Sequence, residues 1–113
     1  MEKYYINIVH GKKTIEMEVR GSFTEEDVQR FARDYQNAVS SITTDEYTLE
    51  VDCTNMEILR QEMIPQLEGS MQMYKESGFK TVQFNTKSNA ILKLQIHRLA
   101  RNIGLKNSKV VDV

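Results

Sequence analysis

The stretch TIEMEVRGSFTEEDVQRFARDYQNAVSSI at residues 14–42 places a strand directly before a long amphipathic helix. Over residues 14–20, apolar side chains alternate with polar ones, which is the period of a strand with one buried face and one wet face. Glu16 and Glu18 fall on the wet face. From Glu25 onward the apolar residues follow helical spacing instead. This change of period within one short stretch is typical of an α/β protein.

The helix in this stretch has strong start signals. Thr24 is a good N-cap, because its hydroxyl can accept a backbone amide proton of the first turn. Phe23 and Val28 have the spacing of a hydrophobic staple. The three acidic residues after Thr24 suit the positive end of the helix dipole. Together these signals predict a helix over Glu25–Ser41.

Four further segments have the composition or alternation of strands. Tyr4–Val9 is rich in aromatic and β-branched residues, and a turn at residues 10–13 joins it to the next strand as an antiparallel hairpin. Tyr47–Cys53 alternates, and Lys80–Asn85 and Lys109–Val113 are the two later strands that we predict.

Two more helices lie between these later strands. Pro65 is tolerated only in a first turn, so the second helix begins near residues 61–64, and Gly78 ends it. The third helix follows a cap at Ser88 and ends at Gly104.

The resulting order is β-β-α-β-α-β-α-β, because strands and helices alternate after the first hairpin. This order predicts one α/β domain over residues 1–113, with a single mixed, mostly parallel sheet and three helices. The predicted core comprises Ile15, Met17, Val19, Val28, Phe31, Leu49, Val51, Leu67, Met71, Val82, Phe84, Leu92, Ile96 and Leu99.

Composition narrows the classes of function. The chain has 113 residues and a net charge of −1, which gives no overall attraction to nucleic acid or to a membrane. It has no apolar run of membrane-spanning length and no signal-peptide layout near Met1, and its single cysteine excludes an intramolecular disulfide. We therefore expect a cytoplasmic protein.

Charge is divided unevenly along the chain. Residues 1–57 carry twelve acidic and six basic residues, whereas residues 58–113 carry four acidic and nine basic residues. The third predicted helix and its exit contribute a basic stripe of Lys93, His97, Arg101 and Lys106. This stripe is either an ordinary solvated face or a contact for an acidic partner.

Polar residues gather where the predicted parallel strands end. In sheets of this kind, ligands bind beyond the carboxyl ends of the strands, and a helix N-terminus there can accept an anion. Helix caps and loops are polar for structural reasons too, so this rim has two interpretations. Its members are Ser22, Thr24, Asp52, Thr54, Asn55, Thr86, Lys87 and Ser88.

No catalytic or cofactor motif is present. The chain has no phosphate-binding glycine loop and no nucleophile elbow, and neither histidine has a second ligand at metal-binding spacing. We expect no metal, no cofactor and no enzymatic activity. Cys53 is interpreted as a small buried hydrophobe, with Lys87 as the only candidate activator of its thiol. The six methionines suit either a core or an adaptable binding face.

Residues 49–64, LEVDCTNMEILRQEMI, resemble the signature region of the STAS domain, the family of anti-sigma-factor antagonists and sulfate-transporter tails. Asp52 and Thr54 occupy the Asp and Ser places of the family's Leu-Asp-Leu-Ser-x-Val pattern. The segments at residues 21–24, 78–80 and 101–105 are similar to the family's entrance to helix one, its next strand entry and its exit from helix three. The resemblance implies a non-catalytic regulatory module whose partner is another protein.

The sequence departs from the family where a partner kinase would act. The family's Asp-Ser-Ser-Gly-Leu is replaced by Arg-Gln-Glu-Met-Ile at residues 60–64, so the phosphorylated serine is absent. The resemblance therefore implies a constitutive contact surface on an exposed loop over residues 56–63, with Gln61 or Glu62 at the place of the serine. The predicted contact residues are Met56, Arg60, Gln61, Glu62 and Met63.

Overall fold

A computed structural model describes residues 3–20, 24–56 and 58–113. Short 3-10 turns at His10–Lys12 (η1), Thr44–Glu46 (η2) and Gln61–Met63 (η3) supplement the main elements. Those elements are β1 (Tyr4–Val9), β2 (Thr14–Val19), α1 (Glu25–Ser40), β3 (Thr48–Asp52), α2 (Ile64–Ser77), β4 (Thr81–Thr86), α3 (Ala90–Asn102) and β5 (Ser108–Asp112).

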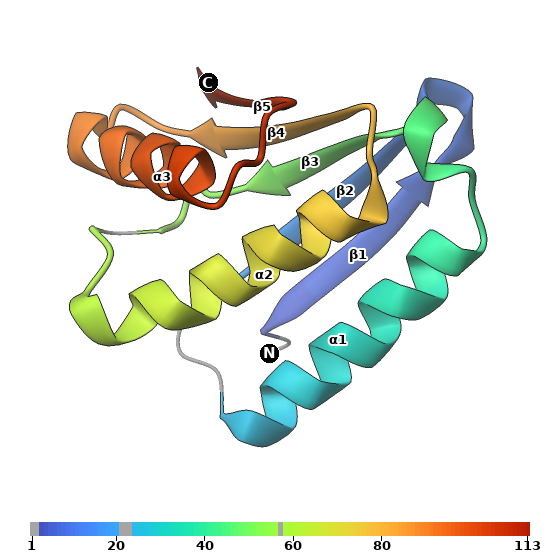
Figure 1. The fold of residues 1–113 in the computed structure, drawn as a ribbon, viewed down its shortest axis with the longest axis horizontal. Helices are drawn as coiled ribbons and strands as arrows, with labels where there is room; N and C mark the ends of the chain where they lie inside the picture. Colours follow the sequence, from blue (N-terminus) through green and yellow to red (C-terminus); the bar gives the residue numbers. More distant parts are fainter. Residues whose placement is uncertain (1–2, 21–23, 57) are drawn as a thin grey trace.

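The strands form one sheet in the order β1-β2-β3-β4-β5. β1 pairs antiparallel with β2, and all other pairs are parallel. Each crossover from β2 onward moves to the next strand in the same direction, and the three helices lie on one face of the sheet (Figure 1). The predicted α/β fold and its element order are confirmed, with element ends differing by about one residue.

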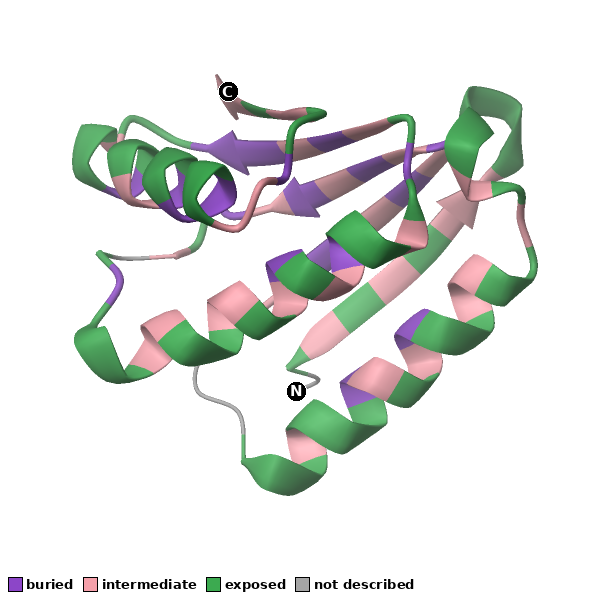
Figure 2. Cartoon of the chain, in the orientation of Figure 1, coloured by how far each residue is buried: buried purple, intermediate pink, exposed green. Residues whose placement is uncertain are grey.

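The core fills the space between this sheet and the helices, where the buried residues concentrate (Figure 2). A chain of aromatic rings crosses it: Phe31 and Tyr35 on α1, Tyr74 on α2 and Phe84 on β4. Successive ring centroids are 6.1, 5.7 and 6.4 Å apart. These separations are typical of favourable aromatic pairs, so the rings join two helices to the centre of the sheet.

The predicted signals at three helix ends are confirmed. Thr24 Oγ1 accepts the backbone N–H of Asp27 at 3.1 Å, and Asp27 in turn accepts the backbone N–H of Thr24 at 2.9 Å, which completes a capping box. Gly78 and Gly104 follow α2 and α3 with φ of +73° and +76°, a conformation that favours glycine.

The predicted cap of the third helix is wrong. Ser88 has φ of +49°, outside the extended conformation of an N-cap, and its backbone N–H donates to Asp112 on β5. The cap is Asn89, whose side-chain oxygen accepts the N–H of Leu92 at 3.0 Å. The contact with β5 is distant in sequence, so local spacing does not reveal it.

Most of the predicted core is buried, but Val28 is 40% exposed, and Val19 and Leu67 are half-buried. Val28 lies in the first turn of α1, where it borders a groove instead of the sheet. Phe23, the other half of the expected staple, lies outside the described residues.

The polar side chains of β2 also differ in their solvent exposure, although the alternating pattern predicts that all of them face solvent. Glu16 is half-exposed there, whereas Glu18 is only 3% exposed. Glu18 Oε1 accepts a bond of 2.6 Å from Arg20, and Oε2 accepts one of 2.9 Å from Asn55. These two bonds lower the pKa of Glu18, with that from Arg20 the larger influence, so its buried carboxylate stays charged.

Candidate functional site

The segment between β3 and α2 begins with a turn held by its own side chains. Asp52 Oδ1 accepts the backbone N–H of Thr54 at 2.9 Å and its hydroxyl at 2.6 Å. The Cys53 N–H donates to the carbonyl of Asn85 on β4 at 2.8 Å. Asn55 extends across to Glu18 on β2. The turn is therefore tied to both neighbouring strands, and this explains the polar side chains of Asp52, Thr54 and Asn55.

Farther along, the same segment is held against α3. The side-chain oxygen of Gln95 accepts the N–H of Leu59 at 2.9 Å, and its amide donates to the Leu59 carbonyl at 3.2 Å. Gln95 thus pairs with the backbone of Leu59 as a neighbouring strand would, while the Leu59 side chain is 5% exposed. Sequence reasoning did not identify Gln95, because nothing in a helical pattern indicates which distant backbone a glutamine bonds.

After this anchor the chain turns outward into α2. Arg60, Gln61 and Glu62 are exposed. The last two belong to the 3-10 turn η3, which leads directly into the helix. The predicted loop over residues 56–63 is thus exposed where the expected contact residues are densest. It is not exposed throughout, because Leu59 is buried and Met56 and Met63 are half-buried.

A groove of about 740 Å³ lies beside this segment, bounded by α1, α2 and the ends of β2 and β3. Met56, Met63 and Met73 contribute flexible thioether side chains to its wall, whereas Met71 is fully buried. Met71 therefore belongs to the core, whereas Met56, Met63 and Met73 border the groove. Other apolar residues of the wall are Val28, Phe31, Ile58 and Leu67, and its polar residues include Asp52, Asn55, Arg60, Gln66 and Ser70.

The polar rim does not form one binding site. Asp52 and Asn55 border the groove, whereas Thr86, Lys87 and Ser88 do not. Thr86 is fully buried, and its hydroxyl has no hydrogen-bond partner among the described residues. Thr24, Asp52, Thr54 and Asn55 all use side-chain polar atoms in internal hydrogen bonds. Ser22 lies outside the described residues.

Cys53 is 3% exposed, as expected of a small buried hydrophobe. Burial, and to a smaller extent the charge of Asp52, raises the pKa of its thiol to about 12. Lys87 does not contribute to this pKa, so the suggested activation of the thiol by Lys87 is wrong. A thiol in this state is a poor nucleophile.

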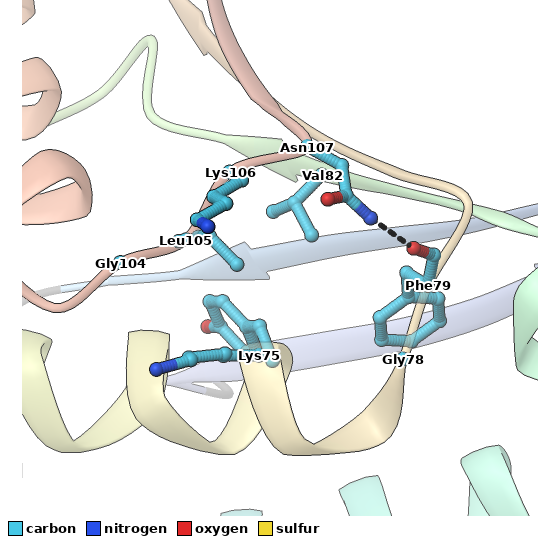
Figure 3. Close-up of a pocket in the computed structure, with 9 residues that line it drawn as sticks. Lys75, Gly78, Phe79, Val82, Gly104, Leu105, Lys106 and Asn107 are labelled. Atoms are coloured by element: carbon cyan, nitrogen blue, oxygen red, sulfur yellow. Dashed lines mark hydrogen bonds between the residues drawn. The ribbon is translucent and has the colours of Figure 1, made fainter.

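A second, smaller hollow of about 370 Å³ lies where the chain leaves α2 and α3 (Figure 3). Lys75 Nζ donates to the carbonyl of Ile103 at 3.0 Å, and Asn107 donates to the carbonyl of Phe79 at 2.8 Å. Both bonds satisfy backbone carbonyls beside the glycines that end these helices, Gly78 and Gly104. This hollow is thus a structural junction between the two helix ends.

Within residues 3–20, 24–56 and 58–113, no three His, Cys, Asp or Glu side chains are grouped to hold a metal ion. Across the same residues, no helix has the length and apolar character to cross a bilayer. No protein-family model, no curated protein and no solved structure matches the chain significantly.

Proposed function

We propose that this chain is a non-catalytic protein-interaction module whose contact surface is residues 56–63 together with the groove beside them. The observation that carries the proposal is the anchoring of this segment. Gln95 holds Leu59 from one side, and Asn55 links the preceding turn to Glu18 on the other. Arg60, Gln61 and Glu62 are therefore displayed from a fixed base. A surface ordered before binding loses less entropy on contact.

The lining of the groove suits a protein partner. Methionine side chains adapt to the shape of an inserted aliphatic or aromatic residue, while the exposed charge of Arg60 stands at the border. We place the module in the cytoplasm, where a lone thiol such as Cys53 stays reduced. In the resemblance to STAS domains, this surface would occupy the place of the phosphorylated loop.

The proposed contact is constitutive. With Gln61 and Glu62 at the place of the family's serine, the surface keeps one negative charge and does not gain the roughly two charges that phosphorylation adds. Glu62→Ala is expected to weaken partner binding with little change in the fold, because this side chain is exposed. Gln61→Arg is expected to weaken it further.

Site-specific photo-cross-linking tests the proposal, because it captures a bound protein whatever its identity. A benzophenone amino acid replaces Gln61 in one variant and Gln36, an exposed glutamine on α1, in a matched control. The expected result is a defined protein adduct from position 61 that is absent at position 36 and equally abundant with and without ATP. Identical adducts from both positions, or none from position 61, would count against the proposal.

The size of the groove favours a second candidate, a small apolar ligand. Its volume of about 740 Å³ lies within the range of roughly 300–1,000 Å³ that is usual for small-molecule sites. A ligand at a hundred times its Kd adds about 2.7 kcal/mol of stability, which a thermal-shift screen of apolar compounds detects. A hit that still binds after Met63→Glu and Met73→Glu would exclude the groove as its site.

A further inference from the structure

The outer face of α3 combines exposed aliphatic side chains with basic ones. Leu92, Ile96, Leu99 and Ala100 face the core, while Ile91 and Leu94 are 55% and 63% exposed. Residues three apart on a helix are neighbours, so these two form one small apolar ridge. Figure 2 shows the outward coils of α3 as largely exposed. Single exposed apolar residues are normal on a protein surface, whereas large contiguous apolar patches indicate contact sites.

Basic side chains surround this ridge. Lys93, His97, Arg98 and Arg101 are all exposed, and α3 contains no acidic residue. Among the described residues, none of these four takes part in an ion pair or a side-chain hydrogen bond that the structure records. Arg98 and Arg101 stand three residues apart on the helix, where like charges repel.

The ridge continues onto the proposed contact surface. Gln95, one turn after Ile91, bonds both backbone groups of Leu59. The residue before Leu59 is Ile58, which is 50% exposed. Three of the most exposed large aliphatic side chains thus belong to α3 and to the segment held against it.

We propose that this surface, defined by Ile58, Ile91, Leu94 and the flanking Lys93, Arg98 and Arg101, docks an acidic amphipathic helix of a partner protein. The partner's aliphatic side chains cover the ridge, and its carboxylates pair with the surrounding cations. This inference rests on the proposed function and states the chemistry of the partner.

Other anionic occupants fit these features less well. A nucleic acid would set its phosphates against the side chains of Ile91 and Leu94, which offer a phosphate no hydrogen bond. A membrane would require a broad apolar face, yet the broad apolar face of α3 is already in the core. The net charge of −6 on residues 1–57 also opposes an extended polyanion, but not a short helix docked on one side.

The test begins with selection of helical peptides from a random display library against the wild-type chain. Winning peptides are expected to combine Asp or Glu with aliphatic residues at helical spacing. Their affinity should fall at least about tenfold in a Lys93→Glu/Arg98→Glu variant and in Leu94→Ser. A Lys12→Glu/Lys80→Glu variant, with the same change of charge at exposed sites elsewhere, should bind as the wild type does. Affinity should also fall steeply with salt, because the Debye length shrinks to about 3 Å at 1 M.

Several results would overturn the inference. Winning peptides that are neutral or basic, or that bind the Lys93→Glu/Arg98→Glu variant normally, would exclude an acidic helix on α3. Self-association that this variant abolishes would assign the face to a second copy. Binding to vesicles with about 30% phosphatidylserine, or to a short DNA duplex, that the variant abolishes would assign it to lipid or nucleic acid. A specific adduct from position 61 alongside any of these results would leave the proposed function standing.

Discussion

Replacing Gln95 with alanine removes the anchor of the segment between β3 and α2. The change deletes both hydrogen bonds to Leu59, of 2.9 and 3.2 Å. Each such bond contributes about 0.5–1.5 kcal/mol net, and the half-buried position of Gln95 lets water replace part of that. We therefore expect a loss of about 1–2 kcal/mol in the free energy of unfolding. With a urea m-value of about 1.5 kcal/mol per M, the midpoint falls by about 1 M.

Amide hydrogen exchange separates a local from a global effect. If the anchor acts as described, protection of the Leu59 amide falls about five- to thirtyfold, because 1–2 kcal/mol changes an opening equilibrium by about that factor. Protection in the central strands follows only the global loss of stability. The cross-linking yield from position 61 should fall too, since the displayed residues lose their fixed base.

Two matched variants sharpen the result. Gln95→Glu keeps an acceptor for the Leu59 N–H but loses the donor to its carbonyl, so an intermediate loss is expected. Gln72→Ala changes an exposed glutamine on α2 and should leave the urea midpoint unchanged. An unchanged midpoint together with unchanged Leu59 protection in Gln95→Ala would refute the anchoring role.

Three other predictions concern the core, the first helix and the thiol. Phe84→Ala, at a residue 1% exposed that contacts Tyr74, should cost about 3–5 kcal/mol in urea unfolding. Thr24→Ala removes the helix cap and should cost about 1 kcal/mol. The backbone N–H of Thr24, then Lys3, lowers the pKa of Asp27 to about 2. The ionised Asp27 carboxylate therefore stabilises the fold fully above its ordinary pKa near 3.8. This stabilisation is lost as the pH falls through about 2, which thermal melts in acid detect. Cys53, whose pKa burial raises to about 12, should react with a thiol reagent at about pH 8 at least a hundredfold more slowly than in urea.

A different result would contradict each of these three predictions. A loss below about 1 kcal/mol in Phe84→Ala would mean that the inward face of β4 is misassigned. If Asp27→Asn leaves the acid melts identical to those of the wild type, the Asp27 charge does not stabilise the folded chain. Rapid labelling of the native thiol would show that the end of β3 opens far more readily than its burial implies.

The sequence by itself determined the order of elements and most of the core. Periods of two and of 3.6 residues are local properties, so residues 14–42 alone distinguish a strand from a helix. Caps that act within one turn, such as Thr24, and glycines that end helices, such as Gly78, are readable for the same reason. The run of alternating strands and helices then restricts the sheet to parallel pairs with right-handed crossovers.

Tertiary structure decided what depends on residues distant in the chain. The cap of α3 is Asn89 and not Ser88, whose backbone is left-handed and whose N–H donates to Asp112 on the last strand. Glu18 is buried, against its place in the alternating pattern, with its carboxylate paired to the Arg20 guanidinium and hydrogen-bonded by the Asn55 amide. An alternating pattern predicts on which face of the sheet a residue lies, but it does not predict which other residues cover that face.

The candidate site shows the same division. Sequence predicted an exposed approach to α2, since Pro65 limits where that helix begins, and Arg60, Gln61 and Glu62 are exposed there. It did not predict the groove, whose wall joins α1, α2 and two strand ends, or the anchor formed by Gln95 and Leu59. Both arise from contacts between segments far apart in the chain. The periodicity of one segment shows which of its faces is apolar, but not which distant segment packs against that face.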